Sequence, residues 1–172
     1  MRVIKKVKSI ILTHYDMFIS FIPGMLGIKL RYVSYKKRID IGKGVIISEL
    51  VSIKFPNRLE LGDNTFIGRG TLIQASGEVE IRENVLIGPE CRIWSSNHNF
   101  KQSNMPINKQ GHSFAKVVIE EDVWLGTNVI VLSGVTIGKG TIVAAGAVVT
   151  KSFPDNVIIG GNPAKLIKRR FD

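Results

Sequence analysis

Aliphatic residues recur at every sixth position through most of this chain. The step appears in three triplets that begin twenty residues apart, and then it runs unbroken through six further positions. These positions are Ile41, Ile47 and Ile53; Leu61, Ile67 and Ile73; Ile81, Ile87 and Ile93; and Ile119, Leu125, Val131, Ile137, Val143 and Val149. A period of six fits neither a helix nor a strand. It indicates a repeat architecture, and we predict a solenoid of about five coils with three flat faces.

Two other positions of the hexad support this register. The fourth residue often occupies a corner where the backbone needs a positive φ, which Gly adopts freely and Asn and Asp adopt less readily. From the fourth coil onward this position holds Asp122, Asn128, Gly134, Gly140 and Gly146. The fifth position holds residues expected to pack beneath the corner: Thr65, Thr71, Val85, Val123, Val129, Val135, Thr141 and Ala147. Extra residues between coils, Leu59-Glu60 and Val79-Glu80, are expected to bulge at one edge.

The pattern divides the chain into three parts. Residues 1–38 are apolar and basic: Val3, Ile4, Val7, Ile10 and Ile11 alternate with Lys5, Lys6 and Lys8 at helical spacing, which predicts a basic amphipathic helix. Pro23-Gly24 interrupts the next apolar run, which is therefore too short to span a bilayer. The segment 1–38 either caps the first coil or lies on a membrane surface, and the cluster Arg31, Lys36, Lys37 and Arg38 fits both interpretations.

The repeat occupies residues 39–156 and is interrupted once. Residues 99–118 lose the period and contain Pro106 and Gly111, so they are expected to form an arm that leaves the coil stack. The last residue before this arm is His98, which makes it a candidate for chemistry. Residues 157–172 are expected to form a turn followed by a short basic C-terminal helix or tail.

Composition narrows the partners and the compartment. The 172 residues suit one domain, and the net charge of +10 suggests an anionic partner. No nucleic-acid recognition motif or aromatic platform is present, so we expect no nucleic-acid partner. The single cysteine, Cys91, lies at a fifth hexad position and is expected to be a packed core thiol. One cysteine and no recognisable signal peptide indicate a cytoplasmic protein, with the inner face of the membrane as an alternative.

Four features together resemble one family. They are the hexads, the arm after the third coil, the segment VWLGTNVIVLSGVTIGKGTIVAAGAVVTKSFPDN (123–156) and the closing GGNPAKLIKR (160–169). Over residues 41–170 the chain resembles the left-handed β-helix acyltransferases that use acetyl-CoA. The resemblance implies an all-β solenoid, a left-handed parallel β-helix with N-terminal helices, and assembly as a homotrimer with each active site between two chains.

The resemblance also implies roles for particular residues. His98, in SSNHNF, would be the general base that takes a proton from the acceptor as it attacks the thioester, because imidazole titrates near neutral pH. Asn97 would bind the acceptor. Backbone N–H groups of Gly126 and Thr127 would stabilise the oxyanion, with Trp124 lining the pantetheine channel. The cofactor-binding set comprises Trp124, Gly126, Thr127, Ala145, Thr150, Lys151, Lys168 and Arg169. Of these, Lys151, Lys168 and Arg169, together with Arg170, would meet the phosphates. For His112 and His14 a surface role is favoured.

The short N-terminal segment resembles that of O-acetyltransferases of bacterial surface polysaccharide synthesis, such as O-antigen or capsule. The implied acceptor is a hydroxyl of a nucleotide- or lipid-linked sugar. N-acetylation of a nucleotide-linked amino sugar and a non-catalytic β-helix scaffold remain alternatives. A zinc-dependent carbonic anhydrase on the same coil would need three ligand histidines, and His14, His98 and His112 lack such a spacing. No metal is therefore expected.

Overall fold

The computed structural model describes the backbone of residues 2–172 and the side chains of residues 11–172. Two helices, α1 (Arg2–Ser20) and α2 (Gly24–Lys36), precede the repeat. The side chains of Val3, Ile4, Lys5, Lys6, Val7, Lys8 and Ile10, on which the predicted amphipathic pattern depended, lie outside the described residues. A backbone helix at this position agrees with the prediction.

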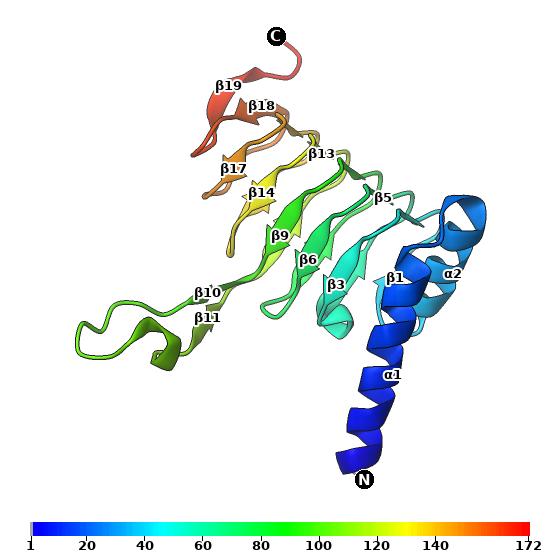
Figure 1. Cartoon of the computed structure of the whole chain (residues 1–172). Coiled ribbons are helices and arrows are strands. Elements are labelled where there is room, and N and C mark those ends of the chain that lie inside the picture. The colour runs from blue at the N-terminus through cyan, green and yellow to red at the C-terminus, as the bar shows by residue number, and fades with distance from the viewer. Residues whose placement is uncertain (1) are drawn as a thin grey trace.

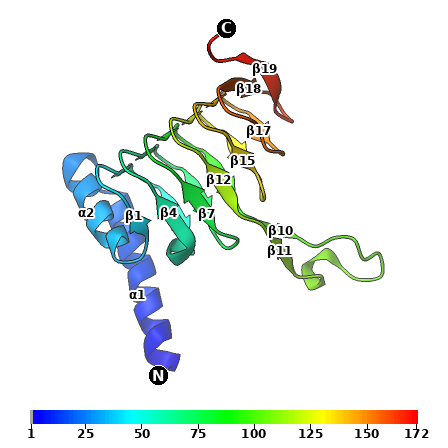
Figure 2. The same ribbon diagram turned by 180° about the vertical axis from the view of Figure 1, so that it is seen from behind.

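The repeat folds into a solenoid with three parallel sheets, as predicted (Figures 1 and 2). Face 1 comprises β1 (Asp40–Ile41), β4 (Leu59–Leu61), β7 (Val79–Ile81), β12 (Val117–Ile119) and β15 (Thr136–Ile137). Face 2 comprises β2 (Ile46–Ile47), β5 (Phe66–Ile67), β8 (Leu86–Ile87), β13 (Trp124–Leu125), β16 (Ile142–Val143), β18 (Val157–Gly160) and the antiparallel β19 (Lys165–Arg169). Face 3 comprises β3 (Ser52–Lys54), β6 (Leu72–Gln74), β9 (Arg92–Trp94), β14 (Ile130–Val131) and β17 (Val148–Val149). Six parallel rungs on face 2 give about one coil more than the five predicted.

The hexad register is confirmed. First-position side chains stack rung on rung inside the prism, and Ile67, Ile87 and Leu125 are each fully buried. All five predicted corner residues have positive φ values, between 56° and 82°, and all eight fifth-position residues are buried. Leu50 and Glu90 occupy equivalent corners with φ values of 58° and 60°. Because side chains with a Cβ rarely adopt this conformation, the chemical pattern could not have identified these two corners.

Three local predictions were wrong. Leu59-Glu60 and Val79-Glu80 do not bulge; they belong to β4 and β7 and pair in register. The extra residues are accommodated just before them, in a 3₁₀ turn (η1, Pro56–Arg58) and in the turn that contains Glu78. The C-terminal segment is also a strand, β19, where a helix was expected, because the free edge of β18 supplies backbone partners for it.

The N-terminal helices cover the first coil. Tyr35, at the end of α2, and Ile39, just after it, belong to the buried core. Arg31 is 1% exposed, and its guanidinium donates hydrogen bonds to the carbonyls of Ile47 (2.7 Å), Ile19 (2.9 Å) and Ile22 (2.8 Å). Burial is the main cause that lowers the pKa of Arg31, opposed by the nearby Glu49 carboxylate. This side chain links the end of α1, α2 and β2, so the inner side of the helices packs on the first coil.

Candidate functional site

The arm begins as a continuation of face 3. After β9 the chain runs through Ser95 into β10 (Ser96–His98) and returns as β11 (His112–Phe114), so the base of the arm is an antiparallel hairpin. Ser95 is buried, and its hydroxyl donates to the carbonyl of Gln74 (2.8 Å) and accepts from the amide of Gly77 (2.9 Å). The hairpin is thus anchored to the coil below. Beyond it lies a short 3₁₀ turn, η2 (Ile107–Lys109), and Figure 1 shows the whole arm projecting well away from the prism.

His98 and His112 face each other across this hairpin. They are directly paired in the strand register, and their ring centroids are 4.2 Å apart with the planes inclined at 43°. Both side chains are exposed. His112 is at the surface, as its sequence context predicts, but the sequence carries no sign of this contact. Thirteen residues lie between the two histidines in the chain, and only the hairpin register brings them together. Asn97 pairs with Ser113 in the same hairpin.

A single amide side chain organises the outer arm. The Gln110 carboxamide donates to the carbonyls of Gln102 (2.8 Å) and Met105 (2.7 Å) and accepts from the amide of Gln102 (3.0 Å). Asn99, next to His98, donates from its side chain to the Gln110 carbonyl (3.0 Å) and from its amide to the Gly111 carbonyl (3.0 Å). These contacts fix the chain just beyond both histidines.

Ionic contacts hold the returning strand to face 1. The Lys116 ammonium lies 2.6 Å from the Glu80 carboxylate, whose other oxygen is 3.0 Å from Arg82. The hydrogen bond from Lys116 is the main cause that lowers the pKa of Glu80, and it raises the pKa of Lys116 in turn. The arm therefore leaves the solenoid through Ser95 and rejoins it through Lys116.

Four of the predicted coenzyme residues lie at another edge of the prism. Trp124 is 48% exposed on β13, and Gly126 and Thr127 follow at the corner between faces 2 and 3. Ala145 occupies the same place one coil further on, where the Gly146 amide donates to the Thr127 carbonyl (2.9 Å). The structure therefore brings these four together, with Trp124, Thr127 and Ala145 exposed and Gly126 buried.

The proposed oxyanion role of Gly126 is corrected by its hydrogen bonding. Its amide donates to the Val143 carbonyl (2.8 Å), as the second residue of a hexad does elsewhere, for example Gly68 to Ile87 (2.8 Å). A Cβ at Gly126 would lie 2.6 Å from the Ala145 nitrogen, so close coil packing explains this glycine. Thr127, at the third position, donates no backbone hydrogen bond within the described chain. Of the two predicted oxyanion donors, Gly126 and Thr127, only the Thr127 amide is free in the described structure to act as one.

The other predicted residues lie elsewhere. Thr150 and Lys151 follow the C-terminal end of β17, whereas Ala145 precedes its N-terminal end. The Lys151 ammonium lies 5.8 Å from the Phe153 ring centroid. Lys168 and Arg169 are exposed on β19. Arg170 forms an ion pair with Asp122 (2.6 Å) and donates to the Gly140 carbonyl (2.9 Å), which gives it a structural role between coils.

His98 and the Trp124–Ala145 edge are far apart within one chain. Asn128 donates to the Pro89 carbonyl, so this edge adjoins the start of the third-face segment that leads to His98. From Pro89 the chain runs mainly extended through β9 and β10, a span of roughly 20 Å or more. Figure 1 shows β13 and β10 on opposite sides of the coil stack.

Cys91 is the core thiol expected. It is fully buried, burial raises its pKa, and its sulfur lies 3.2 Å from the Gly126 carbonyl. Within the described chain, no group of three or more His, Cys, Asp or Glu side chains converges as a metal site would require.

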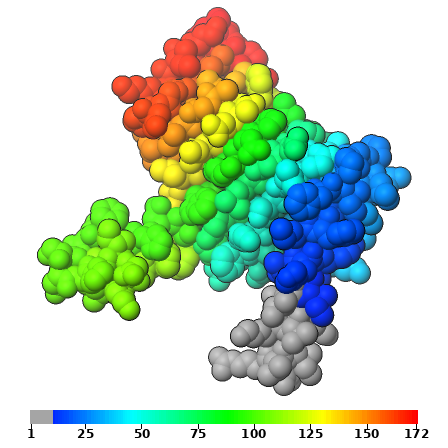
Figure 3. All heavy atoms as spheres, in the orientation of Figure 1, coloured from blue at the N-terminus to red at the C-terminus, as the bar shows by residue number. Residues whose placement is uncertain are grey.

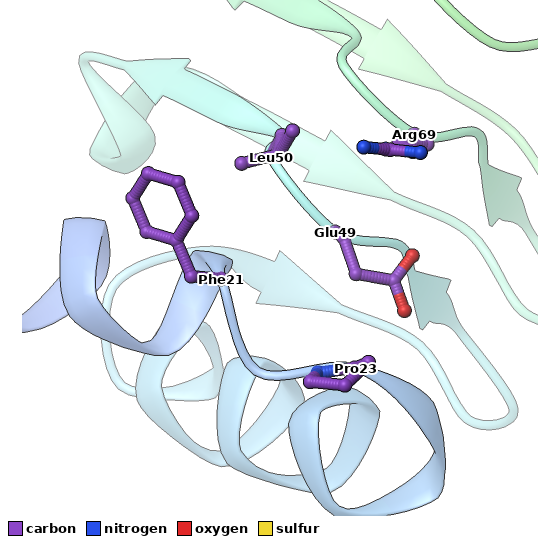
Figure 4. Close-up of a pocket in the computed structure, with 5 residues that line it drawn as sticks. All are labelled: Phe21, Pro23, Glu49, Leu50 and Arg69. Atoms are coloured by element: carbon purple, nitrogen blue, oxygen red, sulfur yellow. The ribbon is translucent and has the colours of Figure 1, made fainter.

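Two hollows lie near the N-terminal helices. A groove of about 770 Å³ runs between α1 and the first coil, bordered by Met17, Phe21 and Phe55. A smaller hollow of about 250 Å³ is lined by Phe21, Pro23, Glu49, Leu50 and Arg69 (Figure 4). Neither hollow is lined by a residue predicted to act in catalysis or to bind coenzyme.

The sequence matches a known repeat model. Residues 116–151 match the family described as bacterial transferase hexapeptide (six repeats). Over 67 residues the chain is 49% identical to galactoside O-acetyltransferase of Lactococcus lactis, a segment that covers 38% of this chain and 32% of that protein. Over 57 residues it is 51% identical to 2,3,4,5-tetrahydropyridine-2,6-dicarboxylate N-acetyltransferase of Staphylococcus aureus, covering 33% and 24%. The chain thus spans about a third or less of these curated relatives.

Among solved structures, the chain is similar to a hexapeptide-repeat-containing acetyltransferase of Vibrio cholerae in complex with acetyl coenzyme A. The TM-score is 0.81 at 25% identity, and the match covers 94% of this chain and 86% of that one. The similarity extends over the helices, the coils and most of the remaining chain, far beyond the segment that matches the repeat model.

Proposed function

We propose that this chain, which carries the bacterial transferase hexapeptide repeat and has the β-solenoid fold of hexapeptide-repeat acetyltransferases, transfers an acetyl group from acetyl-CoA to a sugar hydroxyl. One observation carries the proposal. The segment that matches the repeat model, residues 116–151, contains six of the eight residues that the sequence resemblance assigned to the coenzyme. They are Trp124, Gly126, Thr127, Ala145, Thr150 and Lys151. The O-acetylation of a sugar is favoured because a relative sharing 49% identity over 67 residues is a galactoside O-acetyltransferase.

In this proposal His98 acts as the general base. Its exposed imidazole accepts the hydroxyl proton as the acceptor oxygen bonds to the thioester carbonyl carbon, and the C–S bond then breaks. The departing sulfur leaves with a proton as free CoA, so no acyl group is attached to the protein. The Thr127 amide is the backbone donor for the oxyanion. His112, in ring contact with His98, limits the orientations of the base, and Asn97 binds the acceptor beside it.

The distance between His98 and the Trp124–Ala145 edge supports an active site shared between two chains. A base roughly 20 Å from the Trp124–Ala145 edge cannot reach a thioester bound there. We therefore propose that His98 of one chain faces this edge of a neighbouring chain in a homotrimer, with Lys168 and Arg169 near the phosphates. The proposed location is the cytoplasm, because acetyl-CoA is an intracellular metabolite. The acceptor proposed is a nucleotide- or lipid-linked sugar of surface polysaccharide synthesis.

The experiment follows release of the CoA thiol with a panel of acceptors: nucleotide sugars, their amino-sugar counterparts, polysaccharide repeat units and free serine. His98→Ala is expected to lower kcat by about 10²- to 10⁴-fold, the usual contribution of a general base. His14→Ala removes an imidazole from α1 and serves as the matched control, with activity unchanged. Thiol release that depends on an amino sugar alone would favour N-acetylation, and none with any acceptor would favour a scaffold.

The contact between the histidines has its own test. His112→Ala is expected to lower kcat with little change in KM, and His112→Phe, which keeps a flat ring against His98, to restore part of the loss. Full turnover by His98→Ala would refute the proposed base. Full turnover by His112→Ala would refute only the positioning role.

A further inference from the structure

Apolar side chains predominate among the exposed residues of α1 from Ile11 onward, although Thr13 and His14 are exposed as well. Ile11, Tyr15 and Phe18 follow one another at helical spacing, and Met17 and Phe21 lie at the rim of the groove between α1 and the first coil. Their exposed fractions are 62%, 44%, 69%, 63% and 62%. The opposite side of the helix is already used, because Ile19 is 1% exposed against the rest of the protein. A helix that only capped the solenoid would present a polar outer face to water.

Apolar side chains are also exposed on α2. Met25 and Leu26, in its first turn, are 68% and 64% exposed, and Val33 is 58% exposed. We call these eight residues the outer patch: Ile11, Tyr15, Met17, Phe18, Phe21, Met25, Leu26 and Val33. The two helices that carry these residues lie beside the first coil (Figures 1 and 3). Exposed apolar surface gathered in this way marks an interaction site.

The charge around the patch is positive. Residues 1–38 contain nine basic side chains and one acidic side chain, so they carry +8 of the net +10. The one acid, Asp16, is held by Arg38, with two N–O distances of 2.6 Å. Arg31 is buried. The exposed charges over residues 11–38 are therefore those of Lys29 and Lys36 on α2 and of Lys37 just after it.

We propose that the outer patch docks on an anionic lipid bilayer, with α1 lying in the plane of the interface. The combination of exposed Phe, Met and Leu with lysines is the composition of interfacial helices. Nineteen helical residues span about 28 Å, long enough for the helix to lie along the surface. Among the residues described, no helix is long and apolar enough to cross a membrane. The docking rests on the outer patch and its charges, and it is independent of the proposed acetyl transfer.

The test is co-sedimentation of the full chain with vesicles of phosphatidylcholine, with and without phosphatidylglycerol. The chain is expected to bind the mixed vesicles and to be released by salt. Phe18→Ser combined with Phe21→Ser should weaken binding at least about tenfold, because two phenyl groups no longer enter the lipid. Phe171→Ser, which changes an equally exposed phenylalanine near the C-terminus, is the matched control and should bind as the parent does.

The lysines give a second readout. Lys29→Gln, Lys36→Gln and Lys37→Gln together should weaken binding to the mixed vesicles by about a hundredfold and leave binding to pure phosphatidylcholine unchanged. Thermal melting checks that every variant is folded. Failure of the parent to bind mixed vesicles, or unchanged binding by the double phenylalanine variant, would overturn the proposal. If the parent does not bind vesicles and the double variant has a lower molar mass by light scattering, a second copy of the chain covers the patch, and the lipid proposal is wrong.

Discussion

The buried guanidinium of Arg31 offers a direct test of how the helices are joined to the solenoid. Replacing it in Arg31→Met keeps an apolar side chain of similar length and removes three hydrogen bonds, to the carbonyls of Ile19, Ile22 and Ile47. Each acceptor left without a donor costs about 1–3 kcal/mol, whereas loss of a buried cation is itself favourable. The lowered pKa of Arg31, caused mainly by burial, shows that this opposing effect is present. We therefore expect a net loss of about 2–4 kcal/mol.

Urea unfolding at a fixed protein concentration measures this loss, and hydrogen exchange locates it. Exchange should accelerate most in α1 and α2, because the contact that joins them to β2 is gone. Arg38→Met is the matched control: Arg38 forms a bidentate pair with Asp16 in which both side chains are about one-fifth exposed, and its loss should cost about 1–2 kcal/mol, less than the loss of Arg31. Equal denaturant midpoints for Arg31→Met and Arg38→Met would refute the reasoning.

Two further predictions concern the coils and the arm. Gly126→Ala should destabilise the protein by about 1–3 kcal/mol, seen as a lower melting temperature, because the new Cβ would lie 2.6 Å from the Ala145 nitrogen; an unchanged melting temperature would show that the coils can separate at this corner. The lowered pKa of Glu80 implies stability that is present above the pKa of a glutamate in the unfolded chain and lost as the pH falls through the folded value. Lys116→Met removes the main cause of that shift, so the variant should lose less stability than the parent on acidification below about pH 5; parallel melting curves across that range would contradict the assignment.

The solenoid could be predicted because its determinants are local and repeated. Each aliphatic first position meets its counterpart in the next coil, and the corners at Asp122 and Asn128 need the backbone conformation that their side chains tolerate. The corners that the pattern failed to predict also have a physical explanation. Leu50 and Glu90 hold corners against their own preference because the stacked coils on both sides impose the turn.

The candidate site was less accessible to sequence reasoning. His98 was identified by its place at the end of the repeat, but its contact with His112 depends on strand register within an irregular segment. The engagement of the Gly126 amide follows from the bonding between coils, where second-position amides donate to first-position carbonyls of the next coil. That rule could have been applied to the sequence once the hexad was known. The β19 strand could not have been predicted from the sequence, because only the free edge of β18 favours an extended chain over a helix there.

The reversal at β19 has a consequence for the protein as a whole. A stack of parallel rungs has two open ends, and each could accept the matching rung of another molecule, leading to fibres. At one end α2 lies over the first coil. At the other, β19 runs against the direction of the stack, carries Lys165, Lys168 and Arg169, and is offset by an irregularity at Ile158 and Ile159. A repeat that could in principle continue indefinitely is thus terminated at both ends, which fixes the height of the prism and keeps the molecule from growing by end-to-end addition.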